Sequence, residues 1–167
     1  MDEIINKVAQ SNLEVFDLED YFPTHEFVEI DFSQWLFEGV VLKEKEFREQ
    51  LKNHNWAQYQ NRNIAIKVPN DVIIPAWATL LVVVCVSPIA QRVVVGSLDE
   101  LLTVIYLEQL NQVDFSAYNH KAVILKGCSK KPVPESAYVL AIQKLQPFAK
   151  SIMYGEACSA VPLFKKR

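Results

Sequence analysis

The stretch NIAIKVPNDVIIPAWATLLVVVCVSPIAQRVVV, residues 63–95, decides the fold class of this chain. A β-branched run at Asn63–Val68 is followed by a longer apolar segment at Pro75–Ile89 and by a second β-branched run at Arg92–Val95. The VVVCV in the middle of the apolar segment has strand propensity. However, its leading proline suits the first turn of a helix, and a crossover must connect two parallel strands. The stretch therefore predicts a strand, a helix and a parallel strand.

The rest of the chain continues this alternation, and no internal repeat is apparent. The other expected elements are strands at 27–32 and 121–126, helices at 44–52, 98–113 and, for most of its length, 134–153, and an antiparallel edge strand at 14–18. Ser97 and Glu100 have the spacing of a capping box at the start of the third helix. This order predicts an α/β fold, in which residues 1–167 form a single three-layer domain with a mainly parallel central sheet of four to five strands.

The composition narrows the class of protein. At 167 residues and 50% apolar composition the chain can bury one compact core. The N-terminus lacks a signal sequence, and the longest apolar segment, Ile73–Ala90, is interrupted by prolines and polar residues, so we expect a cytoplasmic protein with no membrane contact. Only four glycines occur, and none forms a phosphate-binding loop, which argues against a nucleotide cofactor.

Charge is distributed unevenly along the chain. Residues 1–62 carry thirteen acidic and six basic side chains, whereas residues 115–167 carry two acidic and nine basic ones. This polarity favours acidic and basic surfaces that face each other within the fold or across a homodimer, or a protein partner. The basic residues lack the interleaved aromatic residues of a single-strand nucleic-acid surface, which argues against nucleic-acid binding.

Two of the three cysteines lie in turn sequences rather than in apolar runs. Cys128 follows the strand expected at 121–126, at the sheet edge where parallel strands bind ligands, and Cys158 follows Gly155. Nearby lysines at 126, 130 and 131 favour the thiolate form of Cys128, which we expect to be exposed and reactive. Cys85 lies in an apolar run and is expected to be an inert thiol.

A straight helix from Glu135 to Tyr154 would separate the two turn cysteines by roughly 30 Å. Two arrangements would bring them together. Pro147 could break the segment into two shorter helices that fold back, or a two-fold dimer could place Cys128 of one copy beside Cys158 of the other.

A metal site at these thiols would need further donors. His54, in polar sequence at the end of a charged helix, is the candidate third ligand, and Glu135, Glu156 and Asp71 are weaker carboxylate candidates. Zinc or iron would suit such a donor set.

Several motifs resemble an uncharacterised bacterial family, the domain-of-unknown-function family numbered 2480. They are WLFEG at 35–39, KEKEFR at 43–48, KGCSKKPVPESAY at 126–138 and GEACS at 155–159 with Pro162 and Leu163. Genes of this family often lie near iron-sulphur cluster assembly genes, so the resemblance implies a thiol, sulphur or iron role for Cys128 and Cys158.

Three classes of function follow from these observations. The leading hypothesis is a metal- or sulphur-handling protein that uses Cys128, Cys158 and His54. The alternatives are a thiol enzyme with Cys128 as its nucleophile and a noncatalytic protein-interaction domain.

Overall fold

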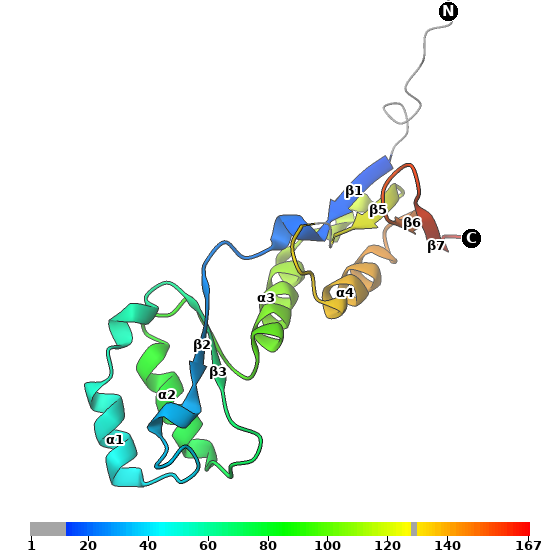
Figure 1. The fold of residues 1–167 in the computed structure, drawn as a ribbon. Helices are drawn as coiled ribbons and strands as arrows, with labels where there is room; N and C mark the ends of the chain where they lie inside the picture. The colour runs from blue at the N-terminus through cyan, green and yellow to red at the C-terminus, as the bar shows by residue number, and fades with distance from the viewer. Residues whose placement is uncertain (1–12, 128–129) are drawn as a thin grey trace, which may run out of the picture. The chain divides into compact units, whose positions relative to one another are not determined.

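The computed structural model of the protein describes residues 13–127 and 130–167. The chain forms two compact units (Figure 1). The inserted unit consists of residues 23–105. The terminal unit combines residues 1–22, described from Leu13, with residues 106–167. Whether the two units fold as one domain stays a prediction.

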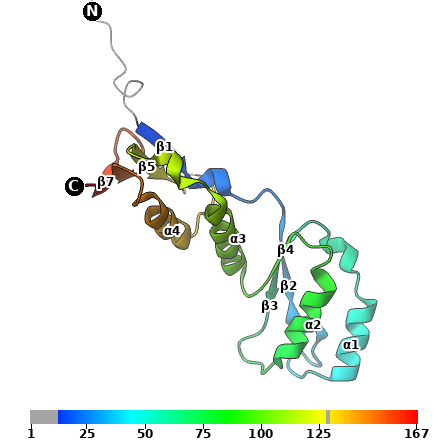
Figure 2. The same ribbon diagram turned by 180° about the vertical axis from the view of Figure 1, so that it is seen from behind.

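The inserted unit is built on a parallel sheet with the strand order β2-β3-β4 (Figure 2). Its elements are β2 (Phe27–Asp31), η2 (Phe32–Trp35), α1 (Glu44–Asn53), η3 (Trp56–Tyr59), β3 (Asn63–Lys67), α2 (Ala76–Val86) and β4 (Arg92–Val95). Side chains alternate across the sheet, so Ile64 and Ile66 pack in the core with α1 and α2. Ala65, between them, packs against Leu101 and Ile105 of α3 (Leu98–Gln112). Helices on both faces make three layers.

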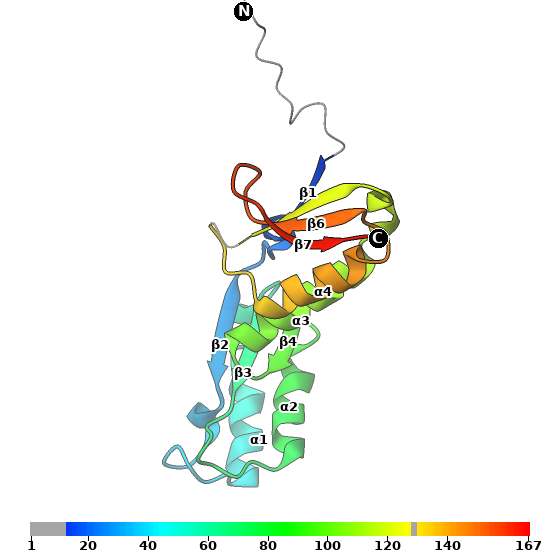
Figure 3. The same ribbon diagram turned by 90° about the vertical axis from the view of Figure 1, so that its right-hand side faces the viewer.

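The terminal unit contains a four-stranded sheet with the order β1-β5-β6-β7. Its elements are β1 (Leu13–Asp17), η1 (Leu18–Tyr21), α3 from Tyr106, η4 (Phe115–Tyr118), β5 (Ala122–Lys126), α4 (Glu135–Leu145), β6 (Ser151–Tyr154) and β7 (Val161–Lys165). β1, β5 and β6 are parallel, and β7 is antiparallel to β6. Helix α4 covers one face of this sheet (Figure 3), where Val123, Leu125 and Ile152 are fully buried.

The structure confirms the α/β class, the mainly parallel strands and the presence of an antiparallel edge strand. The strands are divided between two sheets. The antiparallel strand is β7 and not residues 14–18, because β1 pairs in parallel with β5. The Ser97–Glu100 capping box is also confirmed, since the Glu100 backbone N–H donates to Ser97 Oγ at 3.2 Å and Glu100 Oε2 accepts from the Ser97 N–H at 2.7 Å.

The helix predicted at 134–153 is wrong in its second half. α4 ends at Leu145, and the chain returns as β6, a parallel neighbour of β5. Pro147 cannot continue the helix, because proline lacks the N–H that donates to the preceding turn. The segment is therefore interrupted at this proline, but its second part is the strand β6 and not the second short helix that the sequence analysis considered.

The two units are copies of one motif, which overturns the expectation of no internal repeat. η3, β3, α2 and β4 recur as η4, β5, α4 and β6 at a constant shift of 59 residues. Left-handed residues occupy equivalent positions, with φ of 57° at Asn61 and 59° at His120. β2 with η2 corresponds to β1 with η1 at a shift of 14. Positions in these shared elements therefore have counterparts in the other unit, whereas β7 has none.

Candidate functional site

The carboxyl edge of the β1-β5-β6 sheet brings two loops together. The loop after β5 begins at Gly127, and the loop after β6 begins at Gly155, because β5 and β6 are parallel neighbours with Leu125 in register with Tyr154. The Gly155 N–H donates to the Leu125 carbonyl oxygen at 3.1 Å, which ties the second loop to the end of β5. Gly155 has φ of 112°, a conformation that favours glycine. Ligands of parallel sheets bind at this edge.

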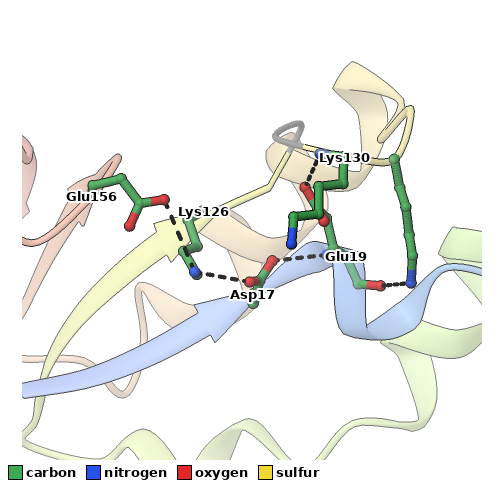
Figure 4. A network of polar contacts seen from close by, with 6 residues as sticks. Asp17, Glu19, Lys126, Lys130 and Glu156 are labelled. Atoms are coloured by element: carbon green, nitrogen blue, oxygen red, sulfur yellow. Dashed lines mark hydrogen bonds and ion pairs between the residues drawn. The ribbon is translucent and has the colours of Figure 1, made fainter.

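A network of charged groups covers this edge (Figure 4). Lys126 Nζ lies 3.2 Å from a carboxylate oxygen of Asp17 and 4.0 Å from one of Glu156. Glu19 accepts a hydrogen bond from the Lys130 backbone N–H at 2.9 Å. The hydrogen bond to Asp17, together with the acidic charges of Asp17 and Glu156, raises the pKa of Lys126. Lys126 therefore stays protonated, with much of its charge balanced by carboxylates.

The balance of charge changes the expectation for the thiols. The sequence predicted that the lysines at 126, 130 and 131 would favour the thiolate form of Cys128. In the structure Asp17 and Glu19, contributed by the start of the chain, lie beside this lysine-rich loop. The field at the loop is therefore less positive than the local sequence indicates.

The two cysteines that the structure describes differ in their exposure to solvent. Cys158 is exposed, in a turn where the Ser159 N–H donates to the Glu156 carbonyl oxygen at 2.9 Å. Cys128 lies outside the described residues. Cys85, on α2, is half-buried, and burial raises the pKa of its thiol, as expected for a packing cysteine. The described thiol that is open to solvent at this edge is therefore Cys158.

An apolar hollow of about 390 Å³ opens beside the loops, a feature that the sequence analysis missed. The residues that line it are Leu125, Val133, Glu135, Tyr138, Ile142 and Tyr154. The rings of Tyr138 and Tyr154 pack edge to face with centroids 5.8 Å apart. Their counterparts in the inserted unit are Thr79 and Val95, so this pair of aromatic rings belongs to the terminal unit alone among the two copies. The hollow can accept an apolar group next to the charged network.

His54 belongs to the inserted unit and not to the unit that contains Cys158. Its ring packs against Trp56 at 4.6 Å, and its Nε2 lies 3.0 Å from the Tyr59 hydroxyl. Burial lowers the pKa of His54, which favours the neutral imidazole. A polar hollow of about 580 Å³ lies beside it, lined in part by Glu46 and Glu49.

Other predicted donors are scattered. Asp71 lies in the loop before α2 of the inserted unit, Glu135 at the start of α4, and Glu156 in the charged network. Within residues 13–127 and 130–167, no group of three or more His, Cys, Asp or Glu side chains is arranged to hold a metal ion. Over the same residues, none of the helices has the length and apolar character needed to span a bilayer.

The comparisons with known proteins give a family. Residues 2–166 match the family model described as "Protein of unknown function (DUF2480)", and the chain belongs to this family. No curated protein and no solved structure matches the chain.

Proposed function

We propose that this member of the DUF2480 family is a sulphur- or metal-handling protein that works through Cys128 and Cys158, with sulphur transfer as the preferred version. The observation that supports the proposal best is the origin of the two cysteine loops at neighbouring parallel strands, joined by the Gly155–Leu125 hydrogen bond.

The loop lengths are compatible with one shared thiol site. The strands that carry Leu125 and Tyr154 lie about 4.8 Å apart at that point, as paired strands do. Cys128 follows Leu125 by three residues and Cys158 follows Tyr154 by four, so each loop spans at most about 10–14 Å. Short loops that start this close together allow the two sulphur atoms to approach bonding distance.

The described donors favour sulphur transfer over a zinc or iron site. A structural metal site needs about four donors, and a catalytic one about three. At this edge the structure describes the thiol of Cys158 and the carboxylates of Asp17, Glu19 and Glu156, and these carboxylates already pair with Lys126 or with the Lys130 N–H. A sulphur relay needs only an accepting thiol and a second thiol that resolves it.

The chemistry of the relay balances without an added oxidant. The Cys158 thiolate attacks the outer sulphur of a persulfide on a donor protein, the donor S–S bond breaks, and the donor leaves as a thiolate. The Cys128 thiolate then attacks the inner sulphur of the Cys158 persulfide, so a Cys128–Cys158 disulfide forms and hydrosulfide leaves with the electron pair of the broken bond. A dithiol reductant restores both thiols, which suits the reducing cytoplasm.

A thiol enzyme that uses a histidine base fits this edge less well. The terminal unit contains one histidine, His120, which lies two residues before the amino end of β5 and therefore at the opposite edge of the sheet from the loops. A carboxylate such as Glu156 is the candidate base that remains near Cys158.

Mass spectrometry of the intact, reduced protein after exposure to glutathione persulfide tests the proposal. We expect the wild type to gain one sulphur atom on Cys158 transiently and then to form the Cys128–Cys158 disulfide with release of hydrosulfide. Cys128→Ser should keep a stable persulfide on Cys158, Cys158→Ser should take up no sulphur, and the control Cys85→Ser should behave like the wild type. Stoichiometric zinc or iron in untagged protein, lost in both loop variants, would favour the metal version. If a Cys128→Ser, Cys158→Ser double variant matched wild type in sulphur uptake and metal content, both versions would be wrong.

A further inference from the structure

Helix α2 has an exposed apolar stripe. The helix AWATLLVVVCV contains no charged residue, and its inward face consists of fully buried Ala78, Val82 and Val86. On the outward face Trp77 is 38% exposed, Leu80 59% and Val84 67%. A helix that is apolar on every side is normally covered on every side. The stripe is therefore a surface that a partner is expected to cover.

The duplicate copy shows that the fold does not require this stripe. α4 occupies the same place in the terminal unit, and its residues equivalent to Trp77 and Val84 are Ser136 and Gln143. The third position, equivalent to Leu80, is Val139, which is 50% exposed. Because the same motif accepts polar residues at two of the three positions, the apolar stripe of α2 is explained by binding and not by folding.

The stripe continues into the loops at the start of α2. Ile73 is 97% exposed, and Val40 and Val41 are each about half exposed. With Trp77 they line a hollow of about 570 Å³. The apolar surface therefore extends beyond one helix.

We propose that a second copy of this chain covers the stripe, with α2 of the two copies packed antiparallel across a two-fold axis. A two-fold axis next to Leu80 places Trp77 of one copy opposite Val84 of the partner subunit, because residues 77 and 84 are equally distant from the midpoint between 80 and 81. The large Trp77 side chain of each copy then faces a smaller valine, and such pairing of large with small residues allows close packing without voids.

The charged groups at the two ends of α2 agree with the antiparallel arrangement. Asp71 lies before the N-terminal end of the helix, exposed, with no ion pair recorded among the described residues. Arg62 lies at the C-terminal end, where its carbonyl oxygen accepts a hydrogen bond from the Gln91 N–H at 2.9 Å and its guanidinium group lies 3.3 Å from a carboxylate oxygen of Glu26; Arg92 follows Gln91 directly. Antiparallel packing brings the N-terminal end of one helix, with Asp71, to the C-terminal end of the other, where two arginines outnumber the one carboxylate of Glu26. It also places the positive end of each helix dipole beside the negative end of the other.

The oligomeric state of the full chain in excess reductant tests this inference independently of the thiol chemistry. Analytical ultracentrifugation over a concentration series is expected to show a dimer with twice the 19.1 kDa mass of the chain. The double substitution Trp77→Ser, Val84→Gln installs the residues that α4 already has. We expect it to raise the dimer dissociation constant at least about a hundred-fold, because central aromatic anchors dominate interfaces and each change occurs twice. The matched control Val139→Gln on α4 is expected to leave the dimer intact.

Crosslinking decides the question even if the double variant fails to fold. In a chain whose three native cysteines are serine, Leu80→Cys is expected to give a covalent dimer with a short bismaleimide, and Val139→Cys is expected to give none. A monomer at every concentration, or a dimer that the α2 changes leave unaltered, would overturn the inference.

Discussion

The buried hydroxyl of Tyr106 gives a sharp test of how β1 is held in the terminal unit. This hydroxyl donates to the Leu18 carbonyl oxygen at 2.9 Å, and both residues are fully buried. The counterpart of Tyr106 in the inserted unit is Phe47, which is equally buried. Tyr106→Phe therefore keeps the ring and opens no cavity, but it leaves a buried carbonyl oxygen without this donor. We expect a loss of about 1–2 kcal/mol in the free energy of unfolding.

Urea denaturation at fixed protein concentration, followed by circular dichroism, measures this loss. With a slope of about 2 kcal/mol per molar urea, the midpoint should fall by about 0.5–1 M at unchanged slope. The reciprocal change Phe47→Tyr should also destabilise, because Phe47 packs among the apolar rings of Phe32 and Trp35 and a hydroxyl would be buried there. A Tyr106→Phe midpoint within about 0.2 M of wild type would refute the reasoning that this bond fastens the first strand.

Three further predictions concern local structure. A Cβ at Gly127 would lie 2.7 Å from the Tyr138 hydroxyl oxygen, so Gly127→Ala should cost about 1–3 kcal/mol, and adding Tyr138→Phe should recover part of the lost thermal stability. Glu100 accepts hydrogen bonds from Ser97, and these bonds, mainly the one from the Ser97 backbone N–H and then the one from its hydroxyl, lower the pKa of Glu100. The contribution of Glu100 to the free energy of unfolding is therefore fully present above the ordinary carboxyl pKa and is lost as the pH falls through the lowered value. Glu100→Gln should therefore flatten the decline of the melting temperature between about pH 5 and pH 3. Peptide mapping after iodoacetamide treatment at pH 7 should show Cys158 alkylated at least about ten-fold faster than Cys85, since Cys158 is exposed and burial raises the pKa of the Cys85 thiol; equal rates would contradict this.

Local signals were sufficient to locate many of the elements. The strand predicted at Asn63–Val68 is β3, and the helix predicted at Pro75–Ile89 contains α2. The prolines determined these results, since Pro75 immediately precedes the first helical residue and Pro88 follows the last ones. Segments with one strong local preference are the ones that sequence reasoning predicts well.

Local sequence signals could not predict which strands pair with each other. β1 pairs with β5 across more than a hundred residues, and nothing within residues 13–17 says whether its neighbour is parallel. The duplication was hidden for a related reason, because buried positions need only an apolar side chain of suitable volume. Ile64 in one copy is Val123 in the other, and Ile66 is Leu125.

The sequence predicted which edge of the sheet carries the candidate site, but it did not predict all the residues that lie there. The strand order alone indicated that the loop with Cys128 would leave the carboxyl edge of the sheet. The loop with Cys158 starts at the same edge because the chain turns back after α4 and forms β6. Pro147 is compatible with this turn but does not by itself require it. The carboxylates of Asp17 and Glu19 reach the edge from the start of the chain, a long-range contact that no local pattern encodes.

The two copies of the motif differ at the positions on which the two proposals depend. Lys67 and Lys126 are equivalent and identical, so the ends of the central strands are alike. Beyond that point, Val68 of the inserted unit corresponds to Gly127 at the cysteine loop, while Trp77 of α2 corresponds to Ser136 of α4. If one copy binds a partner and the other carries the thiols, the two properties should separate experimentally.

The separation can be measured with variants already described. Trp77→Ser with Val84→Gln should abolish the dimer and leave sulphur uptake at Cys158 unchanged, because the substituted residues belong to the inserted unit and Cys158 to the terminal unit. Cys158→Ser should abolish uptake and leave the dimer unchanged, because the proposed dimer forms through α2 and does not involve the thiols. Loss of both properties in either variant would mean that the thiol site is completed by the second copy, and the assignment of one task to each copy would then be wrong.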